Sequence, residues 1–327
     1  MNIKFVIPPS SFLLDERVFM SLGILRVAAY ARLLGYQVSV LDLSGISDYR
    51  SAFCEALQSV NSADTVVAFT ATTPQLPSAV NLLNLAYQSG FRTILGGPHV
   101  TLTVSAANRG VRRAKEHLNL FRRWPVVLVS GDGEMAIDAA VKQSGSFSII
   151  NVDDVANPAF LSADQLNSFP LPARDLVDFK SYRYMIDGQP STSLIGQLGC
   201  PMSCNFCSGR QSPTFRRIRL RSTESVLAEI RHLVEQYHVG GIMFYDDELN
   251  INKSFGDLLG AIIQYKNDSS LDLVFRGFIK SELFTDEQAC LMAEAGFKWI
   301  LSGFESGSER ILDNIKKRAT TKDNTRC

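Results

Sequence analysis

The sequence predicts an α/β protein, in which an N-terminal doubly wound parallel sheet is followed by a partial (β/α) barrel. Two observations predict this class. Short apolar runs alternate with amphipathic stretches, and the alternation weakens only over residues 146–191, which are rich in proline, aspartate and serine. We therefore expect a first domain over residues 1–145, a linker over residues 146–191 and a second domain over residues 192–327.

The first domain is expected to contain five strands joined by helices. The strands cover residues 3–7, 38–43, 65–70, 93–97 and 126–130. The helices lie near residues 22–33, where Gly35 ends the pattern, and near residues 50–60, 77–89 and 133–143. Such strands cross over right-handedly into a parallel sheet, and ligands bind at the carboxyl ends of its strands.

The second domain is expected to contain four strand–helix units, which make about half a barrel. Its strands cover residues 193–198, 241–245, 273–278 and 298–303, and its helices residues 223–237, 255–265, 286–295 and 308–317. Two helix starts carry hydroxyl and acidic capping residues, at Ser222-Thr223-Glu224 and Thr285-Asp286-Glu287.

Composition restricts the function classes. The formal net charge of the 327 residues is zero, so no overall electrostatic attraction to nucleic acid is expected. The apolar N-terminal run is too short for a signal peptide, and no run reaches the length of a membrane span. Six cysteines, three of them scattered, do not form a secreted disulfide framework, so we expect a cytoplasmic protein.

Cys200, Cys204 and Cys207 form the most specific motif of the chain, a CxxxCxxC run directly after the first expected strand of the second domain. Three thiolates without an obvious fourth ligand suit a metal or cluster that keeps one position open. Structural zinc is the alternative, but it usually takes two ligand pairs that are well separated in sequence, and no second pair is recognisable. The motif therefore favours a 4Fe-4S cluster.

Four loops of the first domain are rich in small and hydroxyl-bearing residues. They follow expected strands at residues 8–11, 70–74, 96–101 and 131–134. Such loops let a bulky ligand approach the backbone closely. The same residues also make the ordinary turns of this fold, and the two explanations stay open.

The cysteine motif, with Phe206 directly before its third cysteine, resembles the signature of the radical S-adenosylmethionine (SAM) superfamily. This resemblance implies a 4Fe-4S cluster on the three cysteines, with SAM on the remaining iron. Residues 242–248 resemble the acidic end of the second barrel strand, and residues 303–308 the motif after the fourth. The implied SAM contacts are Asp246, Asp247 and Glu305, with Phe206 near the adenine.

The first domain resembles the cobalamin-binding, flavodoxin-like domain of one radical SAM subfamily. Its glycine loops and the segment 168–175 carry this resemblance. The implied cobalamin contacts are Thr72, Gly96, Gly97, His99, Gly131, Gly133 and Glu134. No Asp-x-His-x-x-Gly motif is present, so no histidine is expected below cobalt. Relatives continue beyond four strand–helix units, so we expect a chain that is truncated at its C-terminus relative to the family.

The resemblance implies a cobalamin-dependent radical SAM enzyme, most often a C-methyltransferase that acts on an unactivated carbon through a 5'-deoxyadenosyl radical. Cyclisation or rearrangement, a sheet domain with another ligand or none, and an inactive, truncated or non-catalytic iron–sulfur protein are the alternatives. The expected partners are a small-molecule or natural-product substrate and an electron donor such as flavodoxin or ferredoxin. The residues do not indicate which substrate.

Overall fold

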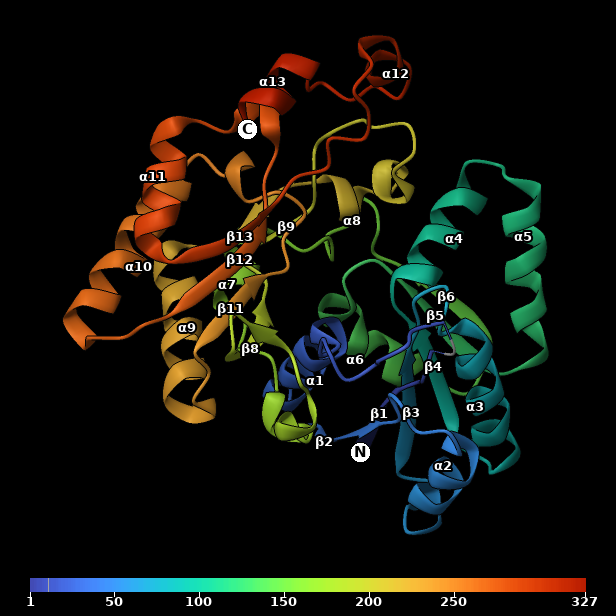
Figure 1. Cartoon of the computed structure of the whole chain (residues 1–327). Coiled ribbons are helices and arrows are strands. Elements are labelled where there is room, and N and C mark those ends of the chain that lie inside the picture. The colour runs from blue at the N-terminus through green and yellow to red at the C-terminus, as the bar shows by residue number, and fades with distance from the viewer. Residues whose placement is uncertain (11) are drawn as a thin grey trace. The chain divides into compact units, whose positions relative to one another are not determined.

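The computed structural model describes residues 1–10 and 12–327, which divide into two compact units. The first unit comprises Met1–Leu161, Phe169–Tyr182 and Gln211–Thr214. The second comprises Ser162–Ser168, Arg183–Arg210 and Phe215–Cys327. Each unit is built on its own sheet with helices packed against it (Figure 1).

The sheet of the first unit is parallel and six-stranded. Its strands are β1 (Asn2–Ile7), β2 (Gln37–Asp42), β3 (Thr65–Thr70), β4 (Arg92–Gly96), β5 (Val126–Ser130) and β6 (Ser148–Asn151), in the order β2-β1-β3-β4-β5-β6. In register, Ile3 of β1 lies opposite Val38 of β2 and Val66 of β3. The order reverses between β1 and β3, as in the predicted doubly wound sheet, so the loops there lie at the usual ligand-binding edge.

β6 was not predicted, because it has only four residues and falls in the range expected as a linker. Ser148 and Asn151 stand at its ends, and the strand is only partly buried at the edge of the sheet. A segment this short gives too little alternation to be recognised from the sequence.

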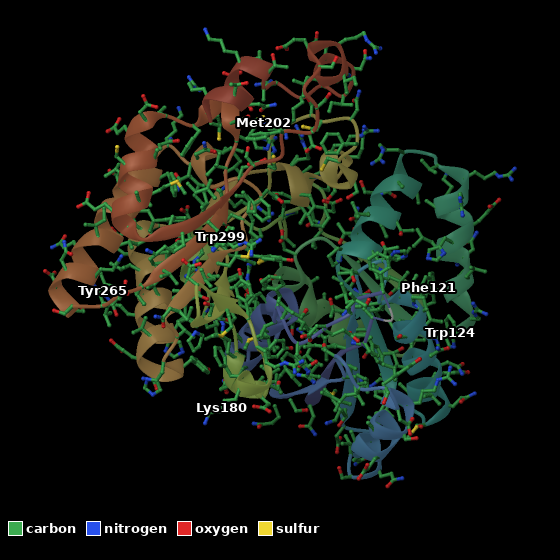
Figure 2. The ribbon with its side chains drawn as sticks, viewed as in Figure 1. Phe121, Trp124, Lys180, Met202, Tyr265 and Trp299 are labelled. Atoms are coloured by element: carbon green, nitrogen blue, oxygen red, sulfur yellow. The ribbon has the colours of Figure 1, made fainter. Side chains whose placement is uncertain are left out.

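Helices cover both faces of this sheet. α1 (Leu22–Leu33) packs against α6 (Gly133–Gln143) on one face. On the other face, α2 (Tyr49–Gln58), α3 (Leu76–Gln88) and α4 (Pro98–Asn108) share one hydrophobic core with the strands, and α5 (Arg112–Asn119) packs on α4 (Figure 1). Phe121 and Trp124, labelled in Figure 2, belong to that core.

The second unit contains the predicted partial barrel. β8 (Gln189–Leu194), β11 (Gly241–Phe244), β12 (Val274–Phe278) and β13 (Phe297–Leu301) run parallel, and β7 (Met185–Ile186) joins β8 antiparallel at the edge. The helices α9 (Thr223–Tyr237), α10 (Phe255–Ser269) and α11 (Asp286–Ala295) connect the strands. The rings of Phe244, Phe275 and Phe297 pack together across β11, β12 and β13.

The first barrel strand starts at Gln189, four residues before the expected start at Ser193. Its first residues, including Pro190, resemble a loop in sequence, yet the strand lies between β7 and β11 and its later residues are buried. The expected caps are confirmed. The side chains of Ser222 and Thr285 accept hydrogen bonds from the backbone N–H groups of Ser225 and Gln288, at the starts of α9 and α11.

Short elements complete the chain. They are α7 (Ala163–Ser168), α8 (Pro213–Arg216), α12 (Glu309–Asn314), α13 (Thr321–Arg326), the antiparallel pair β9 (Gln197–Leu198) and β10 (Arg219–Leu220), and six 3-10 turns: Leu120–Arg123, Arg174–Leu176, Phe179–Ser181, Ser208–Gln211, Leu249–Ile251 and Ser281–Leu283. Within residues 1–10 and 12–327, no helix combines the length and the apolar character that crossing a membrane requires.

Candidate functional site

The cysteine loop of the second unit lies between β9 and β10, which pair as a hairpin at its base. Leu198 of β9 lies opposite Arg219 of β10, and the backbone N–H of Cys200 donates to the carbonyl oxygen of Phe215 at 2.9 Å. Gly199 has a φ of +84°, and a side chain there would overlap the carbonyl oxygen of Arg217. The chain therefore enters and leaves the loop at one closed base, and the glycine makes that close approach possible.

The three thiols of the loop are free and differ in exposure. Cys204 is buried, Cys200 is half-buried and Cys207 is exposed. A turn joins two of them, since the N–H of Cys207 donates to the carbonyl of Cys204 at 3.2 Å. Asn205 fastens the loop to the end of α12 through its backbone N–H, which donates to Ile315 at 2.8 Å.

In the part of the chain that the structure describes, no group of three or more histidine, cysteine, aspartate or glutamate side chains is arranged to hold a metal ion. The donor chemistry nevertheless fits an iron–sulfur cluster, because three free thiols lie within eight residues of one loop. Thiolate ligands commonly assemble only as the metal binds. The loop thus provides the ligands between fixed ends.

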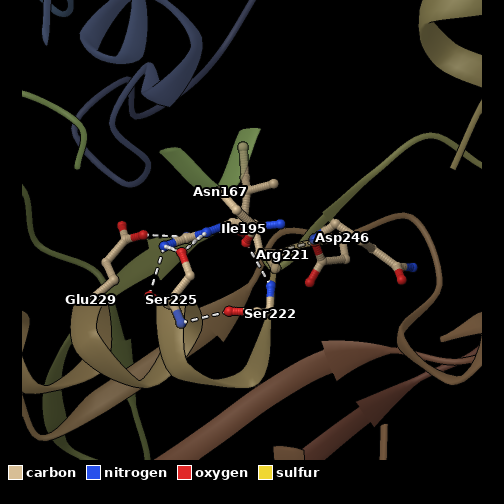
Figure 3. Close-up of polar contacts among 9 residues, drawn as sticks. Asn167, Ile195, Arg221, Ser222, Ser225, Glu229 and Asp246 are labelled. Atoms are coloured by element: carbon tan, nitrogen blue, oxygen red, sulfur yellow. Dashed lines mark hydrogen bonds and ion pairs between the residues drawn. The ribbon is translucent and has the colours of Figure 1, made fainter. Parts of the chain in front are cut away.

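Asp246, the first of three consecutive acidic residues after β11, is 2% exposed. Its Oδ1 accepts hydrogen bonds from the backbone N–H groups of Gly196 at 2.8 Å and Gln197 at 2.6 Å. Burial raises the pKa of Asp246 to about 7, against these two hydrogen bonds, which lower it. Figure 3 shows this carboxyl beside Arg221 and Ile195.

Asp247 and Glu248, the next two residues, act electrostatically on the first cysteine. Burial raises the pKa of the Cys200 thiol, and the charges of Asp247 and Glu248 raise it further. Desolvation also raises the pKa of Asp247, and burial raises that of Glu248 to about 7, although Lys280 and Lys317 lower it. Sequence analysis did not single out Glu248, although its place directly after two aspartates could have indicated it.

Glu305 and Phe206, the other expected SAM contacts, lie in different environments. Glu305 Oε1 is 3.5 Å from Nζ of the buried Lys317, whose charge also acts on Glu248. Glu305 has a left-handed backbone with a φ of +60°. Phe206 is 56% exposed. The structure thus connects Glu305 to the acidic residues through Lys317, and it leaves the aromatic ring of Phe206 on the surface.

Two glycines at the carboxyl edge of the first sheet allow close backbone packing. Gly97 has a φ of +100°, and a Cβ there would lie 2.7 Å from Oγ1 of Thr70. Gly131 has a φ of +101°, and a Cβ there would lie 2.8 Å from the backbone N of Asp153. The protein's own chain occupies the space beside both glycines, so each position requires glycine whether or not a ligand is present.

The remaining loop residues fall into an inward and an outward group. Gly133 faces α1, where its Cβ would lie 2.7 Å from Cγ2 of Val27, and the buried Glu134 forms a 2.7 Å ion pair with Arg26 of the same helix. Thr72 is exposed, and Gly96 at the end of β4 is half-buried.

His99, at the start of α4, is held by two neighbours. Its Nδ1 is 3.1 Å from Oγ1 of Thr73, and its Nε2 is 3.1 Å from Nε2 of His117. Burial and the neighbouring His117 lower the pKa of His99 to about 4, so its imidazole is neutral at pH 7. The two histidines line a groove of about 610 Å³ beside α4 and α5, together with Thr73, Leu102, Thr103, Ala106, Val111, Arg113, Ala114, Glu116 and Leu120.

Three successive apolar residues near the carboxyl edge of this sheet are exposed. Phe12, Leu13 and Leu14 follow β1 at the point where the strand order reverses, and they are 78%, 55% and 107% exposed. Three successive exposed apolar side chains are unusual unless something binds over them.

Comparison with protein families finds that residues 194–327 match the radical SAM superfamily. An uncharacterized methyltransferase of Pyrococcus horikoshii is 26% identical over 98% of this chain and 69% of its own length. An anaerobic magnesium-protoporphyrin IX monomethyl ester cyclase of Cereibacter sphaeroides is 26% identical over 79% of this chain, but the match covers only 43% of that protein.

Two solved structures share the fold over nearly the whole chain. The radical SAM methyltransferase TsrM from Kitasatospora setae, solved with cobalamin and a [4Fe-4S] cluster, has a TM-score of 0.73 at 15% identity and matches over 100% of this chain and 64% of its own. OxsB, a cobalamin-dependent SAM radical enzyme solved with aqua-cobalamin and SAM, has a TM-score of 0.74 at 16% identity over 99% of this chain and 46% of its own. At such identities the similarity shows the fold alone.

Proposed function

We propose that this chain, whose residues 194–327 match the radical SAM superfamily, is a cobalamin-dependent radical SAM enzyme whose reaction is C-methylation of an unactivated carbon in a small molecule. One observation carries the proposal. The CxxxCxxC loop carries three free thiols and starts from a closed base after β8, and the acidic residues Asp247 and Glu248 follow β11, the parallel neighbour of β8. A set of thiols beside carboxylates suits a cluster that binds a cationic amino acid.

Cys200, Cys204 and Cys207 would hold the cluster. When bound, the cluster with SAM supplies a carbon radical and cobalamin supplies the methyl group, which is chemistry of the cofactors and not of side chains. The protein binds and orients these cofactors. Asp247 and Glu248 would accept charge-assisted hydrogen bonds from the ammonium group of SAM. Glu305, which forms an ion pair with Lys317, would also contact SAM.

The first unit would bind cobalamin at the carboxyl edge of its sheet. The exposed apolar residues Phe12–Leu14 support this, as does the similarity of the whole chain to two cobalamin-dependent enzymes. Thr72, Gly96 and His99 remain proposed contacts, because they lie outward at the ends of β3 and β4. Gly97, Gly131 and Gly133 would contribute by shaping the loops, whereas Glu134 is already paired with Arg26.

Anaerobic reconstitution with iron, sulfide and hydroxocobalamin tests the proposal. We expect the desalted protein to retain cobalamin and to form 5'-deoxyadenosine from SAM with dithionite, or with flavodoxin or ferredoxin as the electron donor. Cys200→Ala should lose bound iron, whereas Cys290→Ala, an exposed cysteine on α11, should keep it. A filled cluster without 5'-deoxyadenosine would indicate a non-catalytic iron–sulfur protein, and loss of cobalamin on desalting would remove the methyltransferase proposal.

Cyclisation is a second candidate, because two of the relatives with 26% identity are named anaerobic magnesium-protoporphyrin IX monomethyl ester cyclases. The fate of SAM separates the two reactions. Methyl transfer forms S-adenosylhomocysteine alongside 5'-deoxyadenosine, whereas a reaction without methyl transfer forms no S-adenosylhomocysteine.

A further inference from the structure

The turn Ile195–Gln197, between β8 and β9, determines where the cysteine loop begins. Two side chains and one backbone group hold it, and Figure 3 shows Arg221 and Asp246 near Ile195. Arg221 donates through its backbone N–H to the carbonyl of Gly196 at 3.0 Å and through Nη1 to the carbonyl of Ile195 at 3.0 Å. Asp246 accepts the N–H groups of Gly196 and Gln197. Both the N–H and the carbonyl group of Gly196 are therefore hydrogen-bonded.

Arg221 is itself fixed by the first turns of α9. Its Nε and Nη2 donate to the side chain and carbonyl of Ser225 at 2.9–3.1 Å, and its Nη1 pairs with the buried Glu229. Ser222, which caps α9, also donates its N–H to Oδ1 of Asn167 at 2.7 Å. The turn thus rests on a buried polar network that leaves little freedom to move.

The surroundings of Asp246 leave no room for the amino acid end of SAM. The small cavity that Asp246 lines with Gly196, Gln197 and Arg221 measures about 10 Å³, enough for about one water molecule. Oδ2 of Asp246 is buried without a hydrogen-bond partner among the described residues, which is where such a water would bind. A Cβ at Gly196 would lie only 3.1 Å from this oxygen.

We propose that Asp246 is a positioning residue, which fixes the Ile195–Gln197 turn and thereby the base of the cysteine loop, and that it does not contact SAM. The contact is left to Asp247 and Glu248, which follow Asp246 at the carboxyl end of β11, the strand that pairs with β8 ahead of the cysteine loop. The statement about SAM rests on the proposed function. The anchoring of the turn by Asp246 does not depend on it. It differs from the sequence-based expectation that both aspartates contact SAM.

Hydrogen exchange of the apo protein tests the anchoring without any cofactor. Asp246→Asn keeps an oxygen acceptor for both amides, whereas Asp246→Ala removes it. We expect the amides of Gly196 and Gln197 to exchange about tenfold faster or more in Asp246→Ala, and within about threefold of the native rate in Asp246→Asn. Asp247→Asn is the matched control and should leave both amides unchanged. Equal exchange in native protein and Asp246→Ala would overturn the proposal.

SAM affinity of the reconstituted protein, measured by equilibrium dialysis, tests the division of roles. Asp246→Asn should bind SAM within about threefold of the native protein, and Asp247→Asn about tenfold more weakly, because it loses a charged partner of the ammonium group. The reverse order would assign the contact to Asp246 and overturn the proposal. If no variant takes up a cluster, the proposed function fails, while the exchange experiment still decides the positioning role.

Discussion

Replacing Asp246 by asparagine should stabilise the second unit at pH 8 and change little below about pH 4. Burial raises the pKa of Asp246 from its ordinary value of 3.8 to about 7. In the unfolded chain the carboxyl loses its proton near the ordinary value, so between these two pH values the folded state holds a proton that the unfolded state releases. The stability from this group is therefore full below about pH 4 and is lost as the pH rises through about 7.

The difference between 3.8 and about 7 corresponds to roughly 4 kcal/mol at pH 8. Asparagine carries no charge, so the variant avoids this cost while its amide oxygen still accepts the N–H groups of Gly196 and Gln197. Hydrogen exchange with increasing denaturant, read on peptides of β8 and β11 in the apo protein, reports the second unit separately from the first.

Asp313→Asn is the control, since Asp313 is an exposed carboxylate on α12 of the same unit. The stability of the Asp313→Asn variant should follow that of the native protein at every pH. If Asp246→Asn changed stability by the same amount at pH 4 and pH 8, the charge at Asp246 would not be buried as described, and the reasoning would be refuted.

Three further predictions concern the first unit. Gly97→Ala should cost about 3 kcal/mol in denaturant unfolding, because its φ is +100° and its Cβ would meet Thr70 and Ala71, whereas Gly110→Ala, with a φ of +87° but open space, should cost about 1 kcal/mol. Equal losses would contradict the close approach. Arg26→Met should cost about 3–5 kcal/mol of stability, because Glu134 stays buried without its cation. Adding Glu134→Gln should restore most of the lost stability. Additive losses in the double variant would refute the buried ion pair. The pKa of His99 is lowered to about 4, so the stability that its neutral ring contributes is lost as the pH falls from 6.5 towards 4. In unfolding curves at pH 7 and pH 5, His99→Gln should remove that loss. The same loss of stability between pH 7 and pH 5 in the variant and the native protein would contradict this prediction.

The strands and the cysteine loop could be predicted because each is encoded locally. β3 is an uninterrupted apolar run, and β5 is buried along its whole length, so both appear in any window of the sequence. Cys200, Cys204 and Cys207 lie within eight residues. The parallel direction of the strands could also be predicted, since helices between strands imply parallel crossovers.

The separate roles of neighbouring residues could not be predicted, because they depend on contacts across the chain. Asp246 and Asp247 are adjacent and chemically identical, and only the backbone of Gly196, fifty positions earlier, distinguishes them. Glu134 lies in a loop motif that suggests a ligand contact, yet Arg26 on α1 takes its charge. Neither partner leaves a signal in the local sequence.

The hairpin at the base of the cysteine loop also has an entropic consequence. Because the N–H of Cys200 already bonds to Phe215, the fifteen intervening peptide links form a closed Ω-type loop before any iron arrives. The conformational freedom that a cluster must remove is then only that of the interior of the loop, since the cost of bringing its ends together has been met during folding. Ligand affinity at this site is thus partly a property of β9 and β10, which contain none of the ligands.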